Sequence, residues 1–84
     1  MCILLDERPA PAALRDVSAR GAFLETNARP ALGRRVTLRH PEAGPIAASV
    51  SGVAPDGIFL AFAGDGAAIA FALAAIGADM TRAV

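Results

Sequence analysis

Turn-forming residues divide the first three quarters of this 84-residue chain into short segments. Pro9 and Pro11 predict a break after the apolar start, and the run Pro55-Asp56-Gly57 predicts a tight hairpin turn, because proline presets φ and glycine tolerates positive φ. Strands are therefore expected over residues 2–5, 12–18, 22–26, 34–40, 45–53 and 58–63. Short strands joined by tight connections indicate an antiparallel sheet or a small barrel.

Two of the expected strands carry clear patterns. In 34–40, Val36 and Leu38 fall on one face, while Arg35, Thr37 and Arg39 fall on the other. The segment 58–63 is apolar on both faces, which predicts a strand that is buried on both sides.

The last quarter of the chain has a helical period instead. Asp65 is a good N-cap residue, and Arg82 is favourably placed for the negative end of the helix dipole. Large apolar residues recur at spacings of four, three and four, forming a stripe of Ile69, Leu73, Ile76 and Met80. We expect this stripe to pack on the sheet or on a partner. The chain is then a single domain, 1–84, with β structure over about 2–63 and a helix over about 66–82.

Composition excludes several classes of protein. With 55% hydrophobic and 19% charged residues, the chain is not of the disordered type. Eight basic residues balance eight acidic ones, which argues against a nucleic acid as partner. The longest apolar run, 67–78, is shorter than the roughly 20 residues that span a bilayer, so no membrane insertion is expected. A single cysteine and the lack of an export signal indicate a cytoplasmic protein.

The sequence offers little for catalysis or metal binding. His40 is the single histidine, and we expect it at the surface because it precedes a proline at a strand end. Cys2 has no basic neighbour in sequence that would lower its pKa. No pair of Cys or His residues has the spacing of metal ligands. We therefore predict a protein that is not an enzyme and that holds no metal or cofactor.

The stretch 15–24 holds the candidate binding residues. Asp16 and Ser18 point to one face of a strand, and Gly21 permits a tight turn and the approach of a ligand. A carboxylate suits the N–H donors on the Watson–Crick edge of guanine. Arg15 and Arg20 flank the same place and can stack on a base or pair with a phosphate. The alternative is a plain hairpin in which Asp16 and Ser18 only satisfy backbone groups of the turn.

A family resemblance favours the binding interpretation. The pattern Asp16-x-Ser18-x-x-Gly21, followed by Ala-Phe-Leu, resembles the Asp/Asn-x-Ser-x-x-Gly motif of PilZ domains. The resemblance covers the chain from about residue 12 onward. It continues through Leu32-Gly33 and Val36-Thr37-Leu38, the strands at 46–53 and 58–62, the turn between them and the final helix.

The resemblance implies a fold and a ligand. PilZ domains are six-stranded antiparallel β-barrels that bind the bacterial second messenger cyclic di-GMP, so this chain is expected to be a non-catalytic signalling module. By position, Asp16, Ser18 and Gly21 match the turn that reads a guanine in the family.

The family's second motif, an Arg-x-x-x-Arg arm that clamps phosphates and guanines, has no counterpart before Asp16. The chain begins about where the first strand is expected, so the arm is missing and binding should be weak. Three explanations stay open. The chain is a degenerate adaptor that binds a protein and no nucleotide, it is a shortened chain, or other arginines replace the arm, the candidates being Arg34, Arg35 and Arg39.

Overall fold

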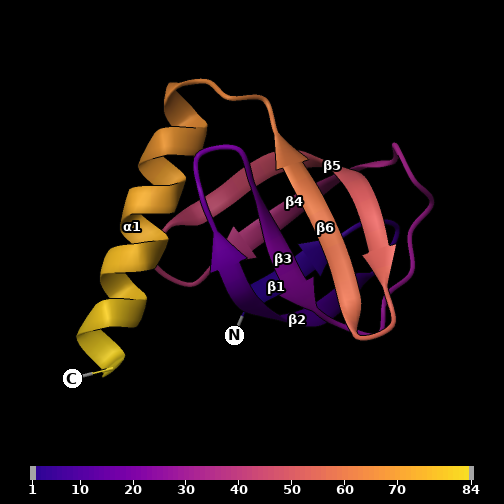
Figure 1. The fold of residues 1–84 in the computed structure, drawn as a ribbon, viewed down its shortest axis with the longest axis horizontal. Coiled ribbons are helices and arrows are strands. Elements are labelled where there is room, and N and C mark those ends of the chain that lie inside the picture. Colours follow the sequence, from indigo (N-terminus) through magenta and orange to yellow (C-terminus); the bar gives the residue numbers. More distant parts are fainter. Residues whose placement is uncertain (1, 84) are drawn as a thin grey trace.

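The turn residues separate six strands and one helix in the computed structural model, which describes the backbone of residues 2–83 and the side chains of residues 2–78. The elements are β1 (Cys2–Leu5), β2 (Pro9–Val17), β3 (Gly21–Glu25), β4 (Arg35–His40), β5 (Gly44–Ala54), β6 (Gly57–Phe62) and α1 (Gly66–Ala83). All strand pairs are antiparallel in the order β1-β2-β3-β6-β5-β4, and β4 pairs with β1 to close a barrel (Figure 1). This confirms the prediction of a mainly β fold, a six-stranded barrel with a C-terminal helix.

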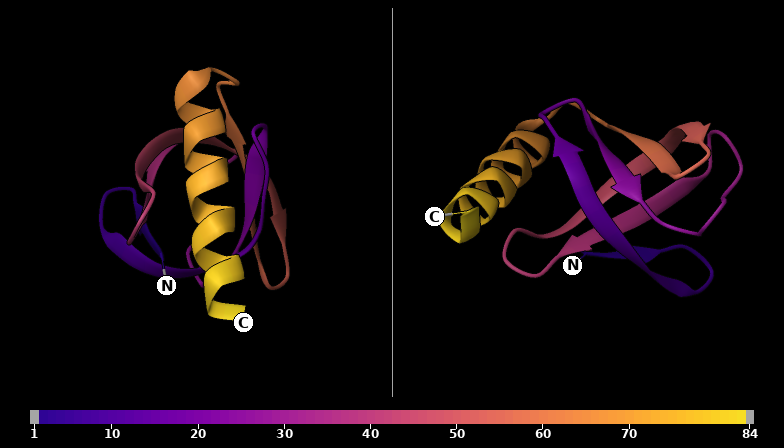
Figure 2. Two further views of the ribbon diagram at one scale, coloured as in Figure 1. Left: turned by 90° about the vertical axis from the view of Figure 1, so that its left-hand side faces the viewer. Right: turned by 60° about the horizontal axis from the view of Figure 1, so that its bottom comes forward.

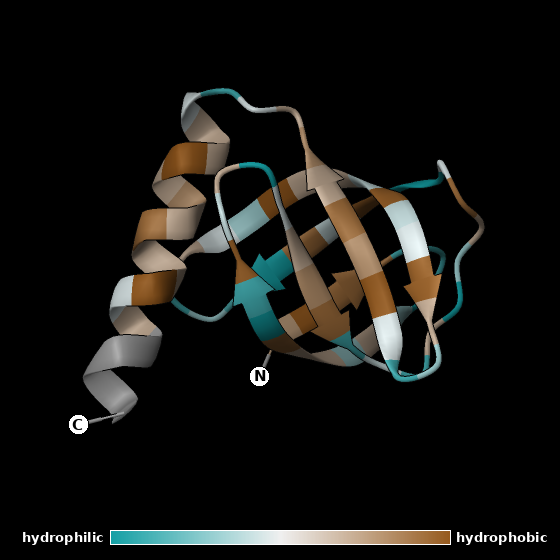
Figure 3. Cartoon of the chain, viewed as in Figure 1, coloured by the Kyte–Doolittle hydropathy of each residue, from teal (hydrophilic) through white to brown (hydrophobic). Residues whose placement is uncertain are grey.

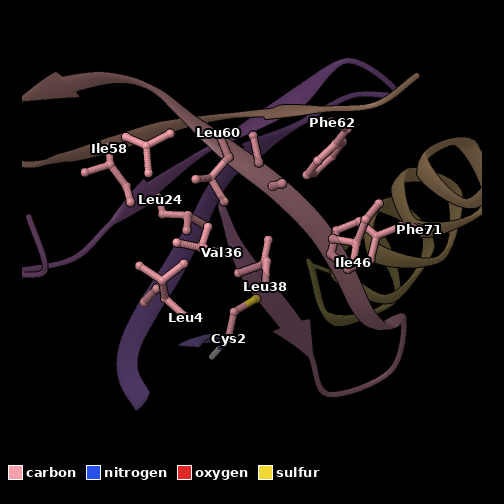
Figure 4. Packing of buried hydrophobic residues seen from close by; sticks show 14 of the residues in the cluster. Cys2, Leu4, Leu24, Val36, Leu38, Ile46, Ile58, Leu60, Phe62 and Phe71 are labelled. Carbon is pink, nitrogen blue, oxygen red and sulfur yellow. The ribbon is translucent and has the colours of Figure 1, made fainter. Parts of the chain in front are cut away.

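Alternating side chains fill the barrel from within. Leu4, Leu24, Leu38 and Ile58, from four different strands, are almost completely buried and meet in one core (Figure 4). The alternation expected in β4 is confirmed, with Val36 and Leu38 buried and Arg35 and Arg39 exposed. The tight turn predicted at Pro55-Asp56-Gly57 is found, because Ala54 pairs with Gly57 across Pro55 and Asp56. Gly57 itself is the first residue of β6 and does not have the expected positive φ.

The break expected after the apolar start is found at residues 6–8, but the expectation that the second strand begins only at residue 12 is wrong, since β2 begins at Pro9 and contains Pro11. They pair with Leu5 and Ile3 of β1, whereas β2 pairs with β3 only from Ala13 onward. One side of this part of β2 therefore faces no strand, and a proline there removes no hydrogen bond of the sheet. The sheet pairing overrides the local breaking tendency.

The strand β6 is not buried on both sides as expected. Phe59 is 46% exposed on the outside of the barrel, where its ring packs against Phe23 with the centroids 4.7 Å apart. In a closed barrel every strand has one outer face. The apolar residues on the outer face of β6 therefore lie at the surface of the barrel and are not part of its core.

The helix α1 lies across one open end of the barrel (Figure 2). Its barrel side is not the predicted stripe: Ile69, Leu73 and Ile76 are 49%, 68% and 39% exposed. The residues that pack on the barrel end are buried instead, namely Ala68, Phe71, Ala72 and Ala75. The small alanine side chains let the helix lie close to the barrel around one aromatic residue. The spacing of large aliphatic residues does not predict such a face.

Phe71 is that aromatic residue. Its ring meets Phe62 edge-on at a centroid distance of 5.7 Å and His40 at 6.1 Å. The expectation that His40 is a surface residue is therefore wrong, since it is only 3% exposed. Its Nδ1 accepts hydrogen bonds from the backbone N–H groups of Glu42 and Ala43, both at 3.1 Å. The histidine thus holds the β4–β5 turn beneath the helix.

The start of α1 agrees with the sequence. The backbone N–H of Ala68 donates to Oδ1 of Asp65 at 3.1 Å, so the predicted N-cap is confirmed. The expectations for the side chains of Met80 and Arg82 lie outside the described residues. In the part of the chain that the structure describes, no helix combines the length and the apolar character needed to cross a membrane.

Candidate functional site

A β-bulge near the end of β2 sets the direction of Asp16. Leu14 pairs with Leu24 of β3, but the next pair is Asp16 with Phe23, so Arg15 is an extra residue. Bulges turn side chains and are common beside binding sites. Here the bulge places the carboxylate of Asp16 on the outer face of the barrel beside the ring of Phe23.

The β2–β3 turn that follows is anchored by its backbone. The N–H of Ser18 donates to the carbonyl of Gly21 at 2.9 Å, and the N–H of Arg20 donates to Oγ of Ser18 at 3.2 Å. The carbonyl of Arg20 accepts from the N–H of Phe62 at 2.8 Å, which ties the turn to the end of β6. Ser18 therefore supports the turn, as the plain-hairpin alternative requires, while the backbone of Arg20 is held at both ends.

Gly21 is needed for a reason other than the one expected. Its φ is not among the positive values found in the chain, so the turn itself does not demand glycine. A Cβ at this position would lie 2.0 Å from the carbonyl oxygen of Leu60 on the neighbouring strand. The absence of a side chain allows β3 and β6 to come together beneath the turn.

These features produce a shallow groove of about 300 Å³ on the outside of the barrel, which we call the motif groove. It is lined by Asp16, Ser18, Arg20, Gly21, Ala22, Phe23, Ser51, Phe59, Leu60 and Ala61. Four of the five predicted ligand-binding residues thus share one cavity. Figure 3 shows a hydrophilic stretch just before the end of β2 and another in the turn that follows this strand, beside α1.

Arg15, the fifth predicted residue, does not line the motif groove. Its guanidinium pairs with the carboxylate of Glu25 at 2.7 Å, across the β2–β3 pair. Both side chains are about half exposed, and ion pairs of this kind are weak and screened by salt. Arg15 also lines a second groove of about 300 Å³ with Ile76 of α1, next to Asp16.

The polar groups of the motif groove differ in how they are engaged. Within residues 2–78, the Asp16 carboxylate and the Arg20 guanidinium take part in no hydrogen bond or ion pair. An ionised carboxylate accepts only, and a guanidinium donates only. The groove therefore offers an acceptor and a cation next to the exposed face of an aromatic pair, Phe23 and Phe59.

Sequence reasoning missed six residues that line this groove, namely Ala22, Phe23, Ser51, Phe59, Leu60 and Ala61. Phe23 and Phe59 are register partners on β3 and β6, strands that are far apart in sequence. Ser51 is the extra residue of a second bulge, between the pairs Val50–Leu60 and Gly52–Phe59. The pairing of β3 with β6, two strands that are distant in sequence, creates this cluster, and no local sequence pattern predicts it.

One of the arginines considered as a replacement for the arm is already engaged. The guanidinium of Arg34 forms ion pairs with Asp6 and with Glu7 of the β1–β2 turn, the latter at 3.2 Å. The hydrogen bond with Asp6 and the charge of Asp6, followed by the charge of Glu7, raise the pKa of Arg34 above its ordinary value. This leaves Arg35 and Arg39 on the outer face of β4.

Among the residues that the structure describes, no group of His, Cys, Asp and Glu side chains could hold a metal ion. Comparisons of the chain with protein-family models, with curated protein sequences and with solved structures found no match. The geometry of the motif groove and the sequence pattern that led to it are therefore the grounds for a functional assignment.

Proposed function

We propose that this chain is a PilZ-like, non-catalytic regulatory module of the bacterial cytoplasm that binds cyclic di-GMP in the motif groove. The observation that carries the proposal is that the Asp16 carboxylate and the Arg20 guanidinium line one cavity with the Phe23–Phe59 pair. Among the described residues, neither charged group takes part in a hydrogen bond or an ion pair. The turn that holds them has the Asp-x-Ser-x-x-Gly pattern.

The chemistry of the groove suits a guanine. The N1–H and amino group of guanine present adjacent donors, which a carboxylate such as that of Asp16 can accept together. The aromatic pair gives the base an apolar surface, and the guanidinium of Arg20 can stack on the base or pair with a phosphate. The volume of about 300 Å³ lies at the lower end of small-molecule sites, as for one base of a larger ligand.

Binding at this site would act by changing the outer surface of the barrel. The turn is fixed to β6 through the carbonyl of Arg20, and Asp16 also lines the groove beside Ile76 of α1. A nucleotide lying over Asp16 would thus alter the surface next to the helix, which a partner can detect. Because the pattern Arg-x-x-x-Arg is lacking ahead of Asp16, we expect weak affinity, in about the micromolar range or poorer.

Isothermal titration of the wild type, Asp16→Asn and Asp56→Asn with cyclic di-GMP tests the proposal. Asp56 is an exposed aspartate in the β5–β6 turn and does not line the motif groove, so it is the matched control. We expect Asp16→Asn to weaken binding about tenfold or more, the scale of a hydrogen bond to a charged group, and Asp56→Asn to leave it unchanged. Cyclic di-AMP should bind the wild type less well, because its adenine lacks the donor pair.

Absence of wild-type binding would overturn the proposal. So would binding that is equally strong in Asp16→Asn. Equal affinity for the two cyclic dinucleotides would show that the guanine edge is not read.

A second candidate function is a protein-interaction adaptor that binds no nucleotide. The exposed stripe Ile69, Leu73 and Ile76 favours it, because its four-three spacing is that of a coiled-coil seam. The chain carries no charge over residues 66–78, so an identical seam is not repelled. A second copy of α1 is therefore the partner that we propose for this candidate.

Sedimentation equilibrium over a range of concentrations tests the adaptor candidate. Self-association should be lost in Leu73→Glu and retained in Ala74→Glu, which adds the same charge at an exposed position outside the stripe. A wild type that stays monomeric would argue against this candidate.

A further inference from the structure

Two adjacent rows of outward-facing residues run across the barrel, and both begin in the motif groove. One row pairs Asp16 with Phe23, and Phe23 with Phe59. The other pairs Gly21 with Ala61, Ala61 with Ser49, and Ser49 with Arg35. Because neighbouring strands lie about 4.8 Å apart, the second row spans on the order of 14 Å from β3 to β4.

The second row has small side chains where the first row has large ones. Its middle positions carry small side chains, Ala61 and Ser49, next to the ridge of the two phenylalanines. A further groove of about 230 Å³ continues this row and is lined by Arg35, Ala47, Ala48, Ser49, Ala61, Phe62 and Ala63. Ala61 lines both this groove and the motif groove, so the two cavities adjoin on the outside of the barrel.

Arg35 stands at the far end of this path and is not engaged elsewhere. Within residues 2–78 its guanidinium takes part in no hydrogen bond or ion pair, in contrast to that of the adjacent Arg34. Arg39 shares the outer face of β4 with Arg35 and is also exposed, but it lines neither groove. Position alone therefore distinguishes Arg35 from an otherwise similar arginine.

We propose that Arg35 binds a phosphate of an extended guanine dinucleotide whose base lies at Asp16. This inference rests on the proposed function and specifies how the ligand lies: the base at the Asp16–Phe23 end, the sugar-phosphate backbone over the small residues Ala61 and Ser49, and the phosphate at Arg35. A guanidinium binds phosphate with two parallel hydrogen bonds, so one well-placed arginine contributes substantially. Arg35 thereby supplies, from β4, a contact that the Arg-x-x-x-Arg arm would provide.

Titration of cyclic di-GMP into Arg35→Gln and Arg39→Gln tests this assignment. The two substitutions remove the same charge from the same face of β4, so they differ only in access to the groove. We expect Arg35→Gln to weaken binding by about 10- to 100-fold and Arg39→Gln by less than about threefold. Arg35→Lys should recover part of the affinity, because lysine keeps the charge without the two parallel bonds.

Salt dependence provides an independent readout. The dependence of affinity on salt concentration should become weaker in Arg35→Gln and stay near the wild-type value in Arg39→Gln. Salt screens the attraction between an arginine and a phosphate, so the dependence falls only when an arginine that contacts the phosphate is removed. Both positions are exposed, and matching thermal melts would show that the folds are intact.

The results separate this inference from the proposed function. If the wild type binds and Asp16→Asn is impaired while Arg35→Gln is not, the phosphate does not lie at Arg35 and only this inference is overturned. Equal losses in Arg35→Gln and Arg39→Gln would also overturn it, since they indicate a general charge effect. A wild type without affinity would overturn both.

Discussion

The glycines of this chain differ in whether their surroundings leave room for a side chain. A Cβ on Gly21 would lie 2.0 Å from the Leu60 carbonyl oxygen, and one on Gly57 would lie 1.9 Å from that of Leu24. Both glycines are in the β3–β6 pair, where two backbones approach each other closely. A Cβ on Gly77, in α1, would meet no described residue outside the helix backbone within 4 Å. The same residue type is therefore a structural requirement in the barrel and a dispensable one in the helix.

We predict opposite effects for alanine at two of these positions. Gly21→Ala should destabilise the fold by about 1–3 kcal/mol, because β3 and β6 must separate to admit the methyl group. Gly77→Ala should stabilise it by up to about 1 kcal/mol, because glycine is a poor helix former. Chemical denaturation followed by circular dichroism measures both, and a stable Gly21→Ala variant would contradict the close approach of the strands.

The helix α1 shows how an element can have two apolar faces with different roles. Its barrel side combines Phe71 with small alanines such as Ala68 and Ala75, all buried. Its other apolar side carries larger aliphatic residues, Leu73 among them, that are largely exposed. Figure 4 shows Phe71 beside Ile46 and near Phe62 at the barrel end. The hydrophobicity of a helical stripe therefore does not by itself identify the face that packs.

At the scale of this element we predict a strong contrast between neighbouring truncations. Phe71→Ala should cost about 3–5 kcal/mol, because a buried ring is removed from the core. Leu73→Ala should change stability by no more than about 0.5 kcal/mol, as expected for an exposed position. Thermal melts of the two variants check this, and a large loss in Leu73→Ala would mean that the stripe does pack on the barrel.

In the whole molecule, the two ends of the barrel are closed by different means. The helix covers one end, over Phe62 and His40. The β3–β4 connection lies at the β5–β6 turn, where the guanidinium of Arg29 donates to the carbonyls of Thr26, at 2.6 Å, and Pro55, at 2.8 Å. The pairing of β1 with β4 closes the barrel, although the first residues of β2 face a strand on one side only. Its ends are therefore the places where the core needs cover.

A chain that ends at Gly64 tests the role of the helix as a cover. Loss of α1 exposes the ring of Phe62 and removes Phe71 from the core, so the free energy of unfolding should fall by at least about 3 kcal/mol. For a domain of this size, that corresponds to a decrease in Tm of about 12 °C or more. The double variant Ile69→Ser and Leu73→Ser, which keeps the covering face, is the control. An unchanged Tm in the shortened chain would show that the barrel is stable without its helix.

Local patterns were sufficient for the parts of the fold that depend on neighbours in sequence. The alternation of β4, the turn at Pro55 and Asp56, and the N-cap of Asp65 each involve residues close along the chain. Their backbone preferences and hydrogen bonds are local, and so the sequence predicted them. The motif Asp16 to Gly21 was found in the same way.

The tertiary structure decided whatever depends on strands that are distant in sequence. Pro9 and Pro11 fit within β2 because one side of that strand faces no partner there. The pairing of β3 with β6 brings Phe59 to Phe23 and requires Gly21 to be a glycine. The closure of the barrel also determines which face of each strand is outside. The shape of the barrel end determines that α1 packs with Phe71 toward the core and leaves Leu73 exposed. Such contacts arise from packing in three dimensions, which a one-dimensional period does not encode.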